Sequence, residues 1–253
     1  MNNLPALSGP DLEVEIAGLA HAYGRASGPV LRLINRMGDG IEGQMKRLPV
    51  RVQAEIGRVT SAALEAAYGA ASVGAFAPDV GRNGVLAAAM VAGAVGGAGG
   101  LLGSLAELPV TITVMLHAIR AEAKAAGYDP AQAAVRLACL EVFASGTPLK
   151  TDDGVNTAFL SARLTVAGPT FQKVAARAVE RLAAVMGQKL AAQAVPVIGA
   201  VTGAALNAAY LSYYRELARI RFRLMRLSEI YGAGEVLGAF GKACALPAVI
   251  EGR

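Results

Sequence analysis

Residues 85–106 read VLAAAMVAGAVGGAGGLLGSLA, a stretch of 22 residues without a charged side chain. Six of these residues are glycines, and three glycine pairs stand four residues apart, at Gly93/Gly97, Gly96/Gly100 and Gly99/Gly103. In a helix this spacing places small residues on successive turns of one face, where a second backbone can lie in direct contact. The stretch therefore predicts a helical segment that packs closely against another helix.

A second uncharged stretch lies about a hundred residues further along the chain. Residues 190–214 read LAAQAVPVIGAVTGAALNAAYLSYY and contain Pro196, Gly199 and Gly203. The pattern predicts a helix from about Pro196 to about Tyr231. We expect its small residues to nest against the first stretch.

The composition favours an all-α protein. The chain has 253 residues, of which 53 are alanine, the strongest helix former and a residue depleted in strands. Hydrophobic residues make up 54% and charged residues only 17%, which excludes disorder for most of the chain. We predict one domain over residues 1–253, a single compact multi-helix bundle with two glycine- and alanine-rich central segments packed closely. Residues 1–56 would form N-terminal helices.

Glycine and proline mark the expected ends of the helices. Because a residue before proline resists helical angles, we expect a break at Leu108, ahead of Pro109, and a hairpin or a sharp bend between the first stretch and residues 109–119. Further along, Gly127 indicates a helix end, and a new helix is expected with Asp129 as its cap and Pro130 at its first position.

A few polar residues interrupt the apolar stretches. A buried Glu107 needs a nearby cation or hydrogen-bond donors, and Lys189 or Arg163 is the expected cation. With Gln193 and Asn207 these residues are predicted to form a buried polar network. The network either fixes how the two glycine-rich segments pack, or it binds a ligand or ion.

The common catalytic motifs are absent from the sequence. Patterns for a serine nucleophile elbow, a zinc protease helix, a phosphate-binding loop and a calcium loop are all missing. His21 and His117 have no nucleophile in a recognisable motif beside them, and Cys139 and Cys244 lack the spacing of a metal site. We therefore expect no enzymatic activity, no cofactor and no metal, with both cysteines as reduced thiols.

The charge pattern directs attention to a membrane surface. Lysine and arginine number 24 against 19 acidic residues, an excess of +5 that is too scattered for nucleic-acid binding. Four arginines follow one stripe of the second predicted helix, and three tyrosines precede them: Arg215, Arg219, Arg223, Arg226, Tyr210, Tyr213 and Tyr214. This pattern suits the headgroup zone of an anionic leaflet, or else a solvated helix face.

The length of the first stretch bears on membrane insertion. As one helix, residues 85–106 would extend about 33 Å, just enough for a bilayer core of about 30 Å. Residues 109–119 would reach only about 16 Å and could not return across it. A polytopic protein is therefore not expected. The segments form either the core of a soluble bundle or a hairpin that enters the membrane reversibly after docking.

Several segments together resemble the EcsC family, a group of bacterial proteins named after the third gene of an ABC-transporter operon. They are LAELPVT at 105–111, GYDP at 127–130, RLACLEVFA at 136–144 and QKLAAQAVPVIGA at 188–200. The resemblance covers about residues 57–240. One departure is that an aromatic-rich patch expected ahead of Ala162 and Arg163 is reduced to Phe159.

The resemblance implies an accessory or membrane-linked role without an established chemistry. The expected function is that of a non-enzymatic, peripheral membrane-associated accessory or scaffold protein near transport or secretion machinery. We expect the protein in the cytoplasm, peripheral to the inner membrane. The expected partner is anionic lipid and not nucleic acid, and self-association into a homo-oligomer is an open alternative. The alternative is a hydrophobic-ligand or lipid-binding protein, or an enzyme, with a pocket around Glu107.

Overall fold

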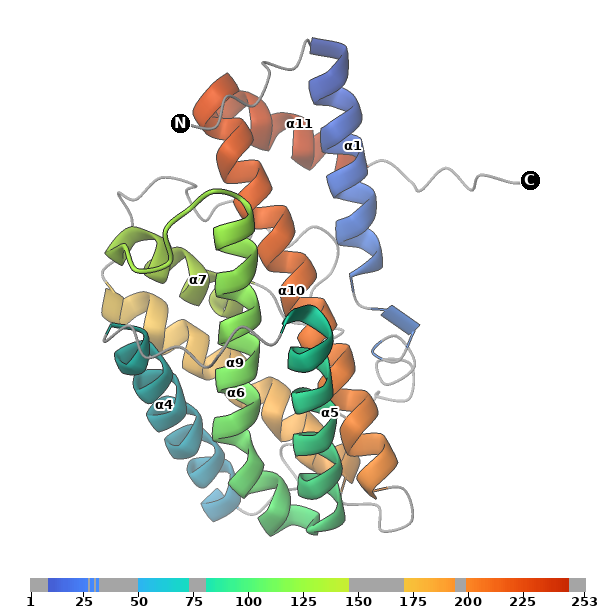
Figure 1. Cartoon of the computed structure of the whole chain (residues 1–253), viewed down its shortest axis with the longest axis vertical. Coiled ribbons are helices and arrows are strands. Elements are labelled where there is room, and N and C mark those ends of the chain that lie inside the picture. Colours follow the sequence, from blue (N-terminus) through green and yellow to red (C-terminus); the bar gives the residue numbers. More distant parts are fainter. Residues whose placement is uncertain are drawn as a thin grey trace, which may run out of the picture.

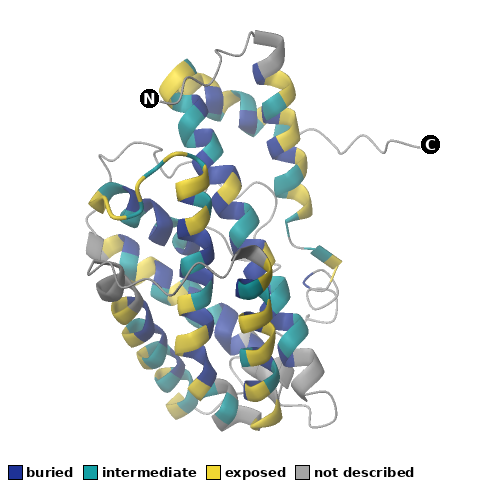
Figure 2. Cartoon of the chain, viewed as in Figure 1, coloured by how far each residue is buried: buried dark blue, intermediate teal, exposed yellow. Residues whose placement is uncertain are grey.

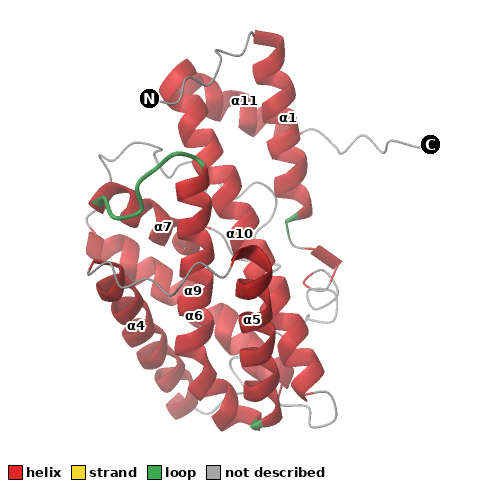
Figure 3. Ribbon diagram, viewed as in Figure 1, coloured by secondary structure: helices red, strands yellow, loops and turns green. Residues whose placement is uncertain are grey.

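The computed structural model describes residues 9–26, 28–29, 31, 50–72, 81–145, 171–193 and 199–245. Over these residues the secondary structure is α-helical and contains no strand, which confirms the predicted all-α class (Figure 3). The helices are α1 (Gly9–Arg25), α4 (Val50–Ser72), α5 (Gly81–Ala98), α6 (Gly100–Ala125), α7 (Ala133–Ser145), α9 (Phe171–Gln193), α10 (Gly199–Tyr231) and α11 (Ala233–Ala245).

Helix α10 connects the two ends of the molecule. Its 33 residues extend about 50 Å. In Figure 1, α5 and α6 lie in front of α10 and α9 in the lower part of the view, while α1 and α11 pack against α10 in the upper part. Helix α4 packs against α6 and α9, and α7 packs against α9. The arrangement is the compact helical bundle that the composition predicts.

The first glycine-rich stretch does not form one continuous helix. It divides at Gly99, where α5 ends and α6 begins, and α6 then continues through Pro109 to Ala125. The predicted break at Leu108 is therefore wrong, although a hairpin does form. The turn is possible at Gly99 because a Cβ there would lie only 2.8 Å from the Cα of Gly103.

Pro109 stays inside α6 because the helix is anchored on both sides of it. A proline within a helix costs about 3 kcal/mol through its missing N–H and its ring. Its ring lies on the exposed face, whereas Leu108 and Ile112 are both fully buried. Their burial opposes a break, and the Thr113 hydroxyl donates to the Pro109 carbonyl at 2.8 Å.

The buried face of α5 becomes smaller toward the turn. Its buried positions are Val85, Ala89, Gly93 and Gly96, spaced four, four and three residues apart. A Cβ at Gly93 would lie 2.2 Å from the carbonyl oxygen of Gly203 on α10. The two predicted segments therefore do meet at backbone distance, and α5 makes its largest interface with α10.

Buried residues of α6 and α10, dark blue in Figure 2, form the centre of the core. On α6 these include Met115 and Ile119, and on α10 they include Leu217, Ile220 and Leu224, all at most 1% exposed. The apolar spacing in the second half of α10 thus predicts the buried face correctly.

The predicted stop and restart after α6 is present with a shifted start. Gly127 has a φ of +88°, a left-handed conformation that favours glycine, and Asp129 accepts a hydrogen bond from the Ala131 amide at 2.9 Å. Pro130 is not the first helical residue, because α7 begins only at Ala133. The Asp129 cap closes a turn rather than the helix itself.

The division at Gly99 also means that residues 85–106 do not form a single long apolar helix. Among the described helices, none combines the length and hydropathy needed to cross a bilayer.

We predict that Gly93→Ala destabilises the fold. The added methyl group would overlap the Gly203 carbonyl, so the free energy of unfolding should fall by about 2–3 kcal/mol. Gly57→Ala is the matched control, because a Cβ at Gly57 meets nothing within 4 Å. That control should be neutral or stabilising by up to about 1 kcal/mol. Urea denaturation measures both values, and equal stability of the two variants would contradict the close contact.

Candidate functional site

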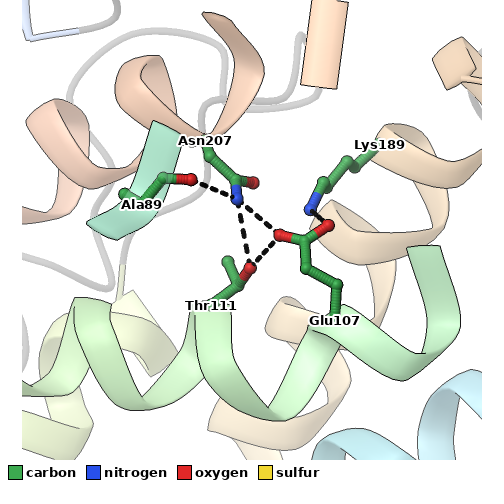
Figure 4. A network of polar contacts seen from close by, with 5 residues as sticks. All are labelled: Ala89, Glu107, Thr111, Lys189 and Asn207. Atoms are coloured by element: carbon green, nitrogen blue, oxygen red, sulfur yellow. Dashed lines mark hydrogen bonds and ion pairs between the residues drawn. The ribbon is translucent and has the colours of Figure 1, made fainter. Parts of the chain in front are cut away.

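Three helices bring one polar network together between α5 and the core. Figure 4 shows Glu107 of α6 between Lys189 of α9 and Asn207 of α10. The Lys189 Nζ lies 2.5 Å from Glu107 Oε2. The Asn207 amide donates to Glu107 Oε1 and, at 2.9 Å, to the carbonyl oxygen of Ala89 on α5. The network thus links four helices.

Local helix geometry positions the carboxylate. Thr111 stands one turn after Glu107 on the inner face of α6, and its hydroxyl donates to Glu107 Oε1. Space for the carboxylate comes from Gly96, since a Cβ there would lie 2.2 Å from Glu107 Oε2. The glycine of α5 is therefore required by the side chain of α6.

Burial controls the electrostatics of the ion pair. The side chains of Lys189 and Glu107 are 0% and 5% exposed. Removal from water lowers the pKa of Lys189, and the neighbouring Glu107 carboxylate opposes that shift. Such a pair is stable only when both partners are present, because a single buried charge costs several kcal/mol.

One hydrogen-bonding atom of the network is unsatisfied. Within the described part of the chain, Asn207 Oδ1 is buried and has no hydrogen-bond partner. The Nδ2 group of the same side chain faces three acceptors, since Thr111 Oγ1 also lies 3.2 Å from it. A buried polar atom without a partner is uncommon in proteins. It marks the place in the network where a small polar group would gain a hydrogen bond.

The structure brings together three of the five predicted network residues. Glu107, Lys189 and Asn207 are in contact, with Lys189 rather than another residue as the cation. Arg163 and the side chain of Gln193 lie outside the described residues. Sequence reasoning missed Thr111, although its position four residues after Glu107 was a usable signal.

The four arginines of the predicted surface stripe lie on α10, most of them beside carboxylates of the same molecule. Arg219 and Arg226 pair with Glu216 and Glu229 at 2.6 and 2.7 Å. Arg223 pairs with Glu15 of α1 and so joins α1 to α10. Arg215 is half-buried. The stripe therefore contributes contacts within the bundle as well as surface charge.

The three tyrosines ahead of the stripe do not face a membrane in this fold. Tyr210, Tyr213 and Tyr214 are buried, and the Tyr214 ring packs edge-on against Phe143 of α7 at a centroid distance of 5.0 Å. The headgroup interpretation of these tyrosines is wrong. They occupy the core-facing side of α10, roughly 180° around the helix from the arginines.

A second buried ion pair was not predicted. Arg221 of α10 is 1% exposed and pairs with Glu141 of α7. Burial lowers the pKa of its guanidinium, and Glu141 opposes the shift. Helical spacing could have indicated this burial. Arg221 follows Tyr214 by seven residues and Leu217 by four, which places Arg221 on the buried face of α10.

The described residues hold no group of three or more histidine, cysteine, aspartate or glutamate side chains arranged for a metal ion. Lysine, carboxylate, amide and hydroxyl around Glu107 are instead suited to holding helices in one register.

The EcsC protein family model matches residues 83–227, more than half of the chain. The chain belongs to this family. The match contains the four polar side chains of the network, so the Glu107 site of this EcsC protein lies inside the family region. Neither a curated protein nor a solved structure matches the chain.

We predict that loss of one ion-pair partner costs far more than loss of both. Lys189→Met leaves the Glu107 carboxylate buried and unpaired, so the free energy of unfolding should fall by about 3–5 kcal/mol. Glu107→Gln/Lys189→Met should lose less stability than Lys189→Met alone, because no buried charge remains. Chemical denaturation gives all the values.

The matched control is Arg219→Ala, which removes a partly exposed pair worth at most about 1 kcal/mol. If Lys189→Met were no more destabilising than this control, the buried pair would not hold the helices together.

Cysteine reactivity provides a separate test of the packing. Burial raises the pKa of the Cys139 thiol to about 12 and that of Cys244 to about 11. A raised pKa means less thiolate at a given pH, roughly a thousandfold less for Cys139 than for a thiol at 9.0. Iodoacetamide at pH near 8 should therefore leave Cys139 unmodified in the folded protein and alkylate it in urea. Mass spectrometry measures both states, and equal alkylation would show that the site is open.

Proposed function

We propose that this EcsC protein is a non-enzymatic accessory or scaffold protein that associates peripherally with a membrane. The observation that carries the proposal is the outer face of α5 and the first half of α6. Large apolar side chains are exposed there without any charge among them: Met90 (42%), Val91 (63%), Val95 (69%) and Val110 (51%). We call this surface the hairpin face.

The hairpin face is favourable for contact with lipid but not for crossing it. Exposed apolar groups gathered on neighbouring helices are typical of interaction sites. The opposite side of the same hairpin is fixed to the bundle by the Gly93–Gly203 contact and by Glu107. These contacts favour shallow docking, in which the bundle stays closed. They disfavour insertion of the whole hairpin into the bilayer.

The remaining parts of the proposal have different support. The non-enzymatic role is supported by the closed Glu107 network, in which Lys189 and Asn207 are both 0% exposed. The link to transport or secretion machinery, and a position in the cytoplasm at the inner membrane, rest on the operon association implied by the family resemblance.

A second candidate function is binding of a hydrophobic ligand or lipid around Glu107, as carrier or enzyme. The unsatisfied Asn207 Oδ1 favours it, because a ligand hydroxyl or amide there would supply the missing donor. Mass spectrometry of extracted protein tests it. A lipid that co-purifies with the wild type and is lost in Asn207→Leu supports this function, and its absence from both contradicts it.

We predict that Val91→Asp/Val95→Asp strongly weakens membrane binding without unfolding the protein. Both side chains are mostly exposed, so stability should change little, whereas two charges on the hairpin face should weaken vesicle partitioning by more than about tenfold. Vesicle flotation measures partitioning, and circular dichroism checks the fold.

Val14→Asp is the matched control, because Val14 is 73% exposed but lies on α1. It should bind like the wild type. Unchanged flotation of the Val91→Asp/Val95→Asp variant would refute the hairpin face as the lipid contact.

A further inference from the structure

The start of α4 lies at the end of the molecule where the hairpin of α5 and α6 turns (Figure 1). Helix α4 packs directly against α6. In Figure 1, α4 begins at the lower end of the molecule, the same end at which α5 turns into α6. The first two residues of α4 are exposed, and Val50 is 80% exposed. An exposed valine and an exposed arginine, Arg51, therefore stand at the first positions of the helix that begins at this end of the molecule.

Arg51 differs from the other exposed arginines nearby on the chain and on α10. Arg58, about two turns after Arg51 on α4, pairs with Glu55, and Arg219 of α10 pairs with Glu216. Among the described residues, Arg51 makes no ion pair or hydrogen bond. Its guanidinium is therefore available to an anion from outside the protein.

We propose that Arg51 is the headgroup site of the membrane surface, and that it binds the phosphate of an anionic phospholipid. This inference rests on the proposed function. Arginine holds phosphate through its planar, permanently charged guanidinium. When the apolar side chains of α5 enter the boundary of the acyl chains, Val50 enters beside them and Arg51 extends to the phosphate level. An anionic bilayer fits both features, because its acyl chains accept the apolar side chains and its phosphate groups accept the Arg51 guanidinium.

The position of the α10 arginines supports Arg51 over the stripe predicted from sequence. Gly203 contacts α5 near the hairpin turn, and Arg219 follows it by 16 residues, or about 24 Å along α10. Arg226 lies about 35 Å along the same helix. Arg219 and Arg226 thus lie far along α10 from the hairpin turn, whereas the helix that carries Arg51 begins at the end of the molecule where the hairpin turns (Figure 1).

The test compares Arg51→Gln with wild type on two kinds of vesicle. One kind is phosphatidylcholine alone, and the other is phosphatidylcholine and phosphatidylglycerol in equal parts. Arg51→Gln should bind the anionic vesicles about fivefold more weakly and bind the neutral vesicles as the wild type does. Added salt should weaken the wild type on anionic vesicles more than it weakens the variant.

Three comparison variants make the failures distinguishable. Arg25→Gln removes an exposed arginine of α1 and should change nothing. If Arg51→Gln binds like the wild type while Val91→Asp/Val95→Asp binds much more weakly, the headgroup site is refuted and the proposed function stands. If Arg219→Gln/Arg226→Gln weakens anionic binding and Arg51→Gln does not, the α10 stripe is the headgroup site. If the wild type binds neither vesicle, the proposed function fails and this inference fails with it.

Discussion

The bundle depends on one buried carboxylate. Glu107 projects from α6 into a space where α5 has no side chain, and there it meets an ammonium group from α9 and an amide from α10. Each partner comes from a different part of the chain, so the pairing can form only when these helices are in register. The apolar surfaces of small residues specify register poorly, since alanine and glycine offer few distinct shapes. A directional polar contact supplies what they lack.

The glycines and the network act together. The buried face of α5 narrows from Val85 to Gly96, which lets α5 approach α10 until backbones touch at Gly93 and Gly203. Without that approach Asn207 would not reach the Ala89 carbonyl, to which it donates. Because α5 packs through its inner face, its outer face makes no packing contact with the described part of the bundle. The valines on that outer face are exposed and form an apolar surface.

Much of this architecture was predictable from the sequence, for physical reasons that differ between elements. Alanine content predicts the helical class, and glycine spacing predicts the close contact between helices. A glutamate within an apolar stretch predicts a neighbouring cation, which is Lys189. The turn was placed at Pro109 because local backbone preference was weighed without the burial of Leu108 and Ile112, which keeps α6 whole. The tyrosines of α10 were assigned to the surface from their residue type, and Arg221 was not considered, whereas their helical phase places all of them inside.

The lack of a side chain at Gly96 links its fate to that of Glu107. A methyl group at position 96 would occupy the space that the carboxylate needs, and a shorter acid at position 107 would withdraw from Lys189. Neither position can drift alone, since each substitution leaves a lysine in the interior without its counter-ion. We therefore expect tolerated changes at residues 96, 107 and 189 to occur together.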